Sequence, residues 1–172
     1  SNQYKDDRDI FSGLYIWDRE EYHMLQGSYP VIFISFADVK QGNYKDAVQK
    51  IKKIISDLYR QYRYLADYSS FTDSDKNKIT GMTDRMDDVT AQDALKDLAY
   101  FLSEYYGKNV IILLDEYDTP MQEAYIHGYW DEFTSFMRGF LNATFKTNPY
   151  CERAIMTGIV DTETSSPLGS KI

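Results

Sequence analysis

The chain has 172 residues and a net charge of −8 at pH 7, and its 43% of hydrophobic residues are enough for the core of one domain. The acidic balance argues against a basic surface for nucleic acid or anionic membrane. One cysteine excludes an internal disulfide, and two histidines exclude a zinc cluster of the usual kind. No run of about 18 apolar residues is present. We therefore expect a cytoplasmic protein with no nucleic-acid and no membrane partner.

The first half of the chain predicts one buried strand followed by a long helix. Residues 29–36 (Tyr-Pro-Val-Ile-Phe-Ile-Ser-Phe) are almost all apolar, which is typical of a strand buried on both faces. From about Tyr44 to Leu65 the apolar residues recur every three or four positions, which predicts an amphipathic helix packed on a sheet. Residues 67–89 lack this regularity. They predict an exposed helical insertion, with Thr72 as the N-cap and an acid three residues later as its partner.

The second half repeats this alternation. Thr90, with an acid three residues later, predicts the start of another helix, and Gly107 predicts its left-handed end. Five apolar residues, 110–114, then predict a second strand. A third strand is predicted over 153–160.

Two further helices are predicted between the second and third strands. Thr119, Pro120 and Gln122 form a capping-box pattern with proline at the first helical position. An apolar stripe from Trp130 to Phe145 predicts the next helix. Strands that alternate with helices imply parallel pairing through right-handed crossovers. The sequence therefore predicts an α/β fold with a parallel sheet.

Asp115 and Glu116 directly follow the second strand, at the edge where open α/β sheets bind ligands. In nucleotide-hydrolysing P-loop proteins this position holds the Walker B acids: the first orients Mg²⁺ and the second polarises the attacking water. The alternative is a strand that simply ends in an acidic turn, and the pattern alone leaves both readings open. Thr157, near the end of the third strand, should emerge beside Asp115. Asp118 is better placed to cap the next helix than to bind metal.

Four segments, in this order, resemble the predicted AAA-ATPase-like family, bacterial P-loop proteins in which a PD-(D/E)XK nuclease-like domain often follows. They are residues 11–16 (Phe-Ser-Gly-Leu-Tyr-Ile), residues 29–36, residues 110–120 and residues 156–159 (Met-Thr-Gly-Ile). The resemblance spans residue 11 to about residue 160. It implies an ASCE-type P-loop fold, a three-layer sandwich whose parallel sheet has the strand order 5-1-4-3-2.

The resemblance also implies a function and its residues. Asp115 would be the Mg²⁺ acid, Glu116 the catalytic glutamate and Thr157 the polar sensor of an ATPase. The 172 residues contain no Gly-x-x-x-x-Gly-Lys-Ser/Thr loop, however, and phosphate binding needs that loop. The cofactor-binding residues are therefore unknown. After Val160 a polar run stands where the family continues with a basic residue and a helix.

We therefore expect residues 1–160 to form a partial P-loop domain without its first strand and Walker A loop, followed by a polar tail over 161–172. The parent protein would bind Mg²⁺ and ATP and hydrolyse the nucleotide, whereas this chain alone should bind neither and be inactive. The free edge of the third strand should be covered by the N-terminal segment, by the tail, or by self-association with a second copy.

Two other functions remain open. The first is a non-enzymatic interaction or regulatory module that uses the surface of Tyr129 and Trp130 together with the 67–89 insertion. The second is a Mg²⁺-dependent nuclease that uses Asp115 and Glu116. The nuclease is the weaker alternative, because nuclease-like chemistry in the family belongs to a different domain and this chain is acidic.

Overall fold

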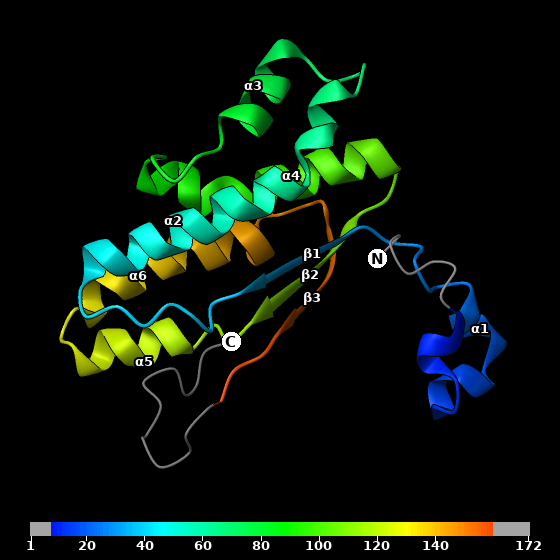
Figure 1. Ribbon diagram of the computed structural model, residues 1–172, viewed down its shortest axis with the longest axis horizontal. Coiled ribbons are helices and arrows are strands. Elements are labelled where there is room, and N and C mark those ends of the chain that lie inside the picture. The colour runs from blue at the N-terminus through cyan, green and yellow to red at the C-terminus, as the bar shows by residue number, and fades with distance from the viewer. Residues whose placement is uncertain (1–7, 160–172) are drawn as a thin grey trace.

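The computed structural model describes residues 8–159, and these residues contain one open sheet with helices on one face (Figure 1). Its strands are β1 (Val31–Ser35), β2 (Val110–Asp115) and β3 (Cys151–Met156). They lie in the order β1-β2-β3, and both pairings are parallel. The predicted α/β fold with a parallel sheet is confirmed.

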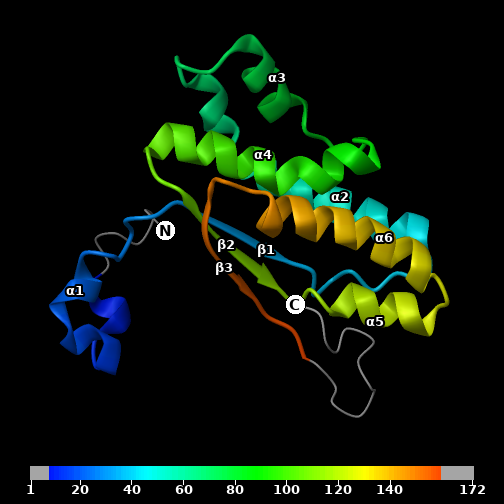
Figure 2. The same ribbon diagram turned by 180° about the vertical axis from the view of Figure 1, so that it is seen from behind.

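The helices connect the strands and build one layer. The α-helices are α1 (Glu20–His23), α2 (Tyr44–Gln61), α3 (Asp73–Gly81), α4 (Asp88–Tyr106), α5 (Thr119–Ile126) and α6 (Trp130–Leu141), with 3₁₀ turns η2 (Arg8–Phe11), η3 (Tyr15–Asp18) and η4 (Arg63–Asp67) and a π-helical turn η5 (Asn142–Lys146). Both ribbon views place α2, α4 and α6 over the same face of the sheet (Figures 1 and 2). The segment that contains α1 lies apart from this body. No helix of the described part is long and apolar enough to cross a membrane.

The hydrophobic core lies between the sheet and this helical layer. Alternate residues of β1 and β2 point into it: Ile32 and Ile34 of β1 and Ile112 and Leu114 of β2 are each at most 2% exposed. The edge strand β3 contributes no fully buried residue. These side chains belong to one cluster with the apolar stripes of α2, α4 and α6. The helical periodicity read from the sequence therefore describes the helix faces that cover the sheet.

The helix ends test the predicted caps. At α3 the capping box between Thr72 and Asp75 is present, as predicted. At the end of α4, Gly107 has the predicted left-handed conformation, with φ 65°. The predicted start of α4 is wrong, because Thr90 lies inside the helix. The N-cap is Asp87, whose carboxylate accepts the Thr90 N–H at 2.7 Å and so satisfies that free helix donor one turn earlier.

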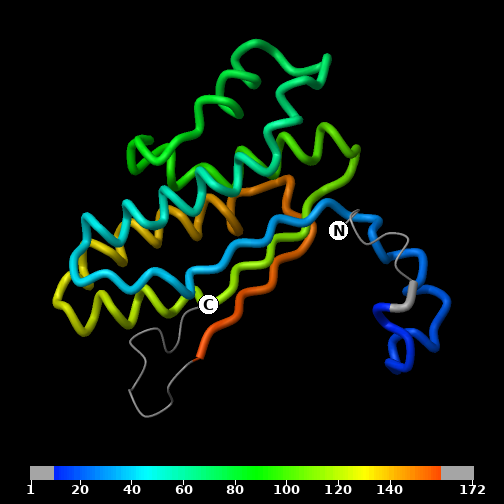
Figure 3. Tube along the Cα trace, in the orientation of Figure 1, coloured from blue at the N-terminus to red at the C-terminus, as the bar shows by residue number. Residues whose placement is uncertain are grey.

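The second face of the sheet has no covering layer among residues 8–159 (Figure 3). Phe33, Leu113 and Ile155 are neighbours in register across the three strands on this face. Phe33 is 56% exposed and Ile155 is 58% exposed. Parallel sheets are normally covered on both faces, and the sequence predicted strands buried on both sides. Within the described residues the sheet has one helical layer and one exposed face, which is consistent with a partial three-layer sandwich.

The outer edge of β3 also lacks a partner strand within residues 8–159. Residues 8–28 do not lie along it, since the segment with α1 sits near the amino ends of the strands (Figure 1). The predicted tail, 161–172, is outside the described residues. Coverage of this edge by the tail or by a second copy stays a prediction.

Candidate functional site

Three polar side chains meet where the strands end. Asp115 is the last residue of β2, Ser35 is the last residue of β1, and Thr157 directly follows β3. Ser35 and Asp115 are partners in the parallel register, two residues beyond the Phe33–Leu113 pair. Because side chains alternate along a strand, these polar groups lie on the uncovered face of the sheet, at its carboxyl edge.

Hydroxyl groups from both neighbouring strand ends hold the Asp115 carboxylate. Thr157 Oγ1 donates to Oδ1 at 2.6 Å, and Ser35 Oγ donates to Oδ2 at 3.0 Å. These bonds favour the ionised form, so the pKa of Asp115 is lowered, first by the Thr157 hydroxyl and then by the Ser35 hydroxyl. Asp115 is thus a fixed carboxylate at the centre of the sheet edge.

Glu116 adopts an unusual backbone conformation. Its φ of 50° is the one positive value at a non-glycine residue among the described residues. Glutamate rarely adopts this left-handed region, and backbone strain of this kind collects at functional sites. The Glu116 N–H donates to Thr157 Oγ1 at 3.4 Å, and the Glu116 carboxylate accepts from Thr119 Oγ1 at 3.2 Å.

The predicted capping box at Thr119 is not formed. Helix α5 begins at Thr119 itself, and Asp118 occupies the N-cap position without a side-chain cap bond. The Thr119 hydroxyl donates to Glu116 instead, and Gln122 Nε2 donates to Asp118 Oδ2 at 3.0 Å. Pro120 lies in the first turn of this helix as its second residue, one place later than predicted. The helix start therefore holds the second acid of the site.

The loop after β2 is tied to the end of β3. The Thr157 N–H donates to the Leu114 carbonyl at 2.9 Å, and the Tyr117 N–H donates to the Thr157 carbonyl at 3.2 Å. Asp118 packs against Gly158 so closely that a Cβ there would lie 2.5 Å from Asp118 Oδ1. The two segments are in contact here, and a side chain at Gly158 would require the Asp118 carboxylate to move.

Replacing Gly158 by alanine should destabilise the protein by about 1 kcal/mol, because the Asp118 carboxylate must move away from the added methyl group and would lose its bond from Gln122. Thermal unfolding of Gly158→Ala measures this cost. The matched control is the double variant Gly158→Ala/Asp118→Ala, which removes the obstructing carboxylate and should recover most of the loss. Equal melting temperatures for Gly158→Ala and the wild type would show that the packing is looser than described.

The residues present fit Mg²⁺, although no group of three or more His, Cys, Asp or Glu side chains within residues 8–159 could enclose a metal. Magnesium usually keeps several waters and takes only one or two carboxylates together with substrate phosphates. Asp115 offers one fixed carboxylate whose oxygens each accept a single hydroxyl here. Such a donor set suits a metal that arrives with a nucleotide.

The sequence correctly predicted that Asp115 and Thr157 lie together, with Glu116 beside them, and it missed Ser35. The signal was present, because Ser35 is the one polar side chain in the apolar run 31–36. The sequence does not say which residue of the first strand lies opposite Asp115. The strand register of the structure shows that it is Ser35.

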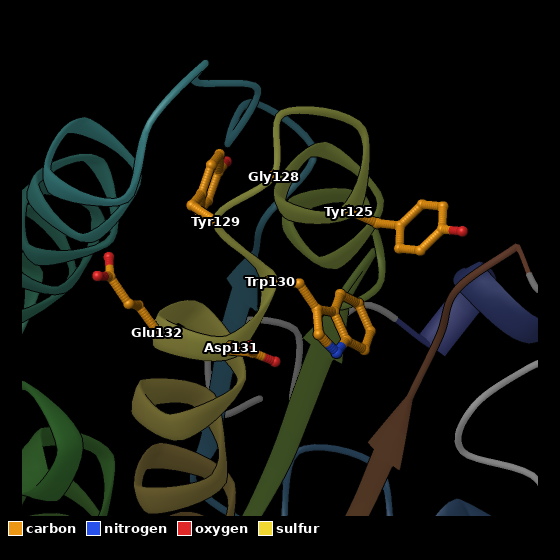
Figure 4. Close-up of a pocket in the computed structure, with 6 residues that line it drawn as sticks. All are labelled: Tyr125, Gly128, Tyr129, Trp130, Asp131 and Glu132. Atoms are coloured by element: carbon orange, nitrogen blue, oxygen red, sulfur yellow. The ribbon is translucent and has the colours of Figure 1, made fainter.

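A separate, shallow pocket lies at the turn between α5 and α6 (Figure 4). It is lined by Tyr125, Gly128, Tyr129, Trp130, Asp131 and Glu132. Tyr125 is 69% exposed, and its ring meets the Trp130 ring edge to face, with centroids 6.1 Å apart. Tyr129 is buried instead, and its hydroxyl donates to the Gln41 carbonyl at 2.6 Å. The exposed aromatic surface therefore involves Tyr125 and Trp130 rather than Tyr129.

Comparison with known proteins finds one family for this chain. The family model described as predicted AAA-ATPase matches residues 1–166. This range is wider at both ends than the stretch of residue 11 to about 160 that the four motifs indicate. No curated protein and no solved structure shows a significant match. The family match, together with the parallel sheet and the acids at its edge, shows that the chain belongs to the AAA-ATPase-like family.

Proposed function

We propose that this chain carries the Walker B part of an ATP-hydrolysing P-loop domain, with Asp115 as the Mg²⁺ acid and Glu116 as the catalytic glutamate. One observation carries the proposal. The Asp115 carboxylate is held by hydroxyls from both neighbouring strand ends, with Glu116 next to it in a left-handed conformation, at the carboxyl edge of a parallel sheet. A strand that merely ended in an acidic turn would not need this arrangement.

The uncovered face supports the proposal through the handedness of the fold. Crossovers from β1 to β2 and from β2 to β3 advance in one direction, and their helices lie on one face (Figure 2). A strand added beyond β3 and connected back to β1 would advance in the opposite direction. Its right-handed crossover would place a helix on the uncovered face.

Such a helix would begin at the carboxyl edge of the sheet, because the added strand runs parallel to β3 and ends there. Its N-terminus would then face Asp115. Helix N-termini bind phosphate through free N–H groups and the helix dipole. We infer that a strand–helix element bearing the phosphate loop completes the site in the parent protein, and that the described residues supply the acids.

In that complete site the residues of this chain would have separate tasks. Asp115 would hold the metal or its waters, kept ionised by Ser35 and Thr157. Bound Mg²⁺ would neutralise charge on the β- and γ-phosphates. The Glu116 carboxylate would orient the attacking water and take up its proton. Thr157, which touches both Asp115 and the Glu116 N–H, would couple the two acids to the end of β3.

This chain alone would hold no nucleotide, since acids without a phosphate loop have no substrate to act on. The test is Mg²⁺-dependent ATP hydrolysis by a longer protein that includes a phosphate loop upstream of residue 1. We expect hydrolysis by that protein and none by residues 1–172. Asp115→Asn in the longer protein should remove it, and Asp118→Asn, an equal charge change in the same loop, should leave it. Hydrolysis that survives Asp115→Asn contradicts the assignment.

The pocket of Figure 4 favours a second function, a protein-interaction module. The Tyr125 and Trp130 rings meet at nearly a right angle, and Asp131 follows Trp130 at the start of α6. Aromatic faces next to carboxylates attract an ammonium or guanidinium group. Trp130 fluorescence in a Trp17→Phe background should respond to an arginine-rich peptide and not to its citrulline counterpart. An equal response to both peptides rejects this module.

A further inference from the structure

The Ser35 hydroxyl has two hydrogen-bond partners: it donates to Asp115, and it accepts from the backbone of the turn that follows β1. Its Oγ accepts the Ala37 N–H at 3.4 Å, and the Phe36 N–H donates to the Asp115 carbonyl at 2.9 Å. The accepting side of the hydroxyl is therefore engaged by its own turn, and its single proton is directed at Asp115 Oδ2. The turn after β1 thus delivers one donor to the acid.

The two hydroxyls act on different oxygens of one carboxylate. Thr157 holds Oδ1 from the β3 side, and Ser35 holds Oδ2 from the β1 side. One donor alone leaves the carboxylate free to turn about the bond to its Cβ, because that torsion is broad for aspartate. Two donors from opposite sides fix the plane of the carboxylate. Groups that orient a ligating carboxylate in this way tune metal binding without touching the metal.

We propose that Ser35 is a positioning residue of this site, which fixes the Asp115 carboxylate for a divalent cation. The inference rests on the proposed function, in which Asp115 is the metal acid. A simpler role would be local: the Ser35 hydroxyl would only complete the turn after β1. The two roles differ in what its removal changes, because a turn residue affects stability and a positioning residue affects metal affinity.

The test measures both quantities on the protein extended upstream to include a phosphate loop, with Mn²⁺ in the presence of a non-hydrolysable ATP analogue as the probe. Paramagnetic broadening of the Leu114, Asp115 and Glu116 amide signals gives the affinity, and thermal unfolding gives the stability. We expect Ser35→Ala to weaken Mn²⁺ binding by roughly tenfold with a melting temperature close to that of the wild type. Ser35→Thr, which keeps a hydroxyl, should restore the affinity.

Thr119→Ala is the matched control, since it removes a hydroxyl from the same neighbourhood that contacts Glu116 and not Asp115. Its Mn²⁺ affinity should stay within about twofold of the wild type. Equal Mn²⁺ affinity for Ser35→Ala and the wild type, in a chain where Asp115→Asn abolishes binding, overturns the role of Ser35 alone. Absence of localised broadening in the wild type overturns the metal site and this inference together.

Discussion

Replacing Glu116 by glutamine should lower ATP turnover by at least about a hundredfold in a protein that joins this domain to a phosphate loop. The amide keeps the shape of the side chain and still accepts the Thr119 hydroxyl bond, but it cannot take a proton from water. Nucleotide binding should persist, because Asp115 and the phosphate loop are unchanged. Steady-state hydrolysis together with equilibrium ATP binding separates these two effects.

A second variant separates the role of the Glu116 carboxylate from that of its left-handed backbone. Glutamine and glutamate tolerate φ 50° about equally, so Glu116→Gln tests the carboxylate alone, whereas Glu116→Gly also relaxes the backbone. We expect both variants to be inactive, with Glu116→Gly no less stable than Glu116→Gln. Full turnover in either variant would remove Glu116 from the mechanism.

Substitutions on the two faces of the sheet should differ in how much stability they cost. Ile112 is fully buried on the helix-covered face, so Ile112→Ala should cost about 2–5 kcal/mol of unfolding free energy. Phe33 is 56% exposed on the other face, and Phe33→Ser should change stability by less than about 1 kcal/mol. Chemical denaturation of the two variants against the wild type measures the contrast.

The same pair of variants reports on what covers the open face. If two copies associate through it, Phe33→Ser should shift sedimentation toward the monomer, and Ile112→Ala should not do so while the chain stays folded. A loss of several kcal/mol in monomeric Phe33→Ser would mean that some part of the chain covers this face. That result would undermine the argument for a missing layer.

Much of the fold was predictable because apolar periodicity reports burial directly. The strand runs around Ile32 and Ile112 and the stripes of α2, α4 and α6 reflect a core that each segment must fill. Continuous apolar strands also predicted two covered faces, and residues 8–159 cover only one. Phe33 and Ile155 are residues at which this expectation and the described structure differ, since both are exposed.

Local polar contacts were harder to predict, since neighbouring acceptors compete for the same donors. Thr90 and Thr119 both match a capping pattern. The N-cap of α4 is Asp87 instead of Thr90, and the Thr119 hydroxyl donates to the Glu116 carboxylate instead of capping α5. The role of Ser35 depends on strand register, which apolar pattern alone does not fix. Asp115 was predictable because it ends the apolar run 110–114. Thr157 is the polar residue that follows residues 154–156, and the strand predicted over 153–160 ends just before it in the structure, at Met156.

The most direct test of the account is calorimetric titration of Mg-ATP into two proteins, this chain and a version extended upstream to include a phosphate loop. We expect a saturable heat signal for the extended protein, which Asp115→Asn weakens, and no signal for residues 1–172. An extended protein that contains the loop and does not bind Mg-ATP would contradict the ATPase assignment.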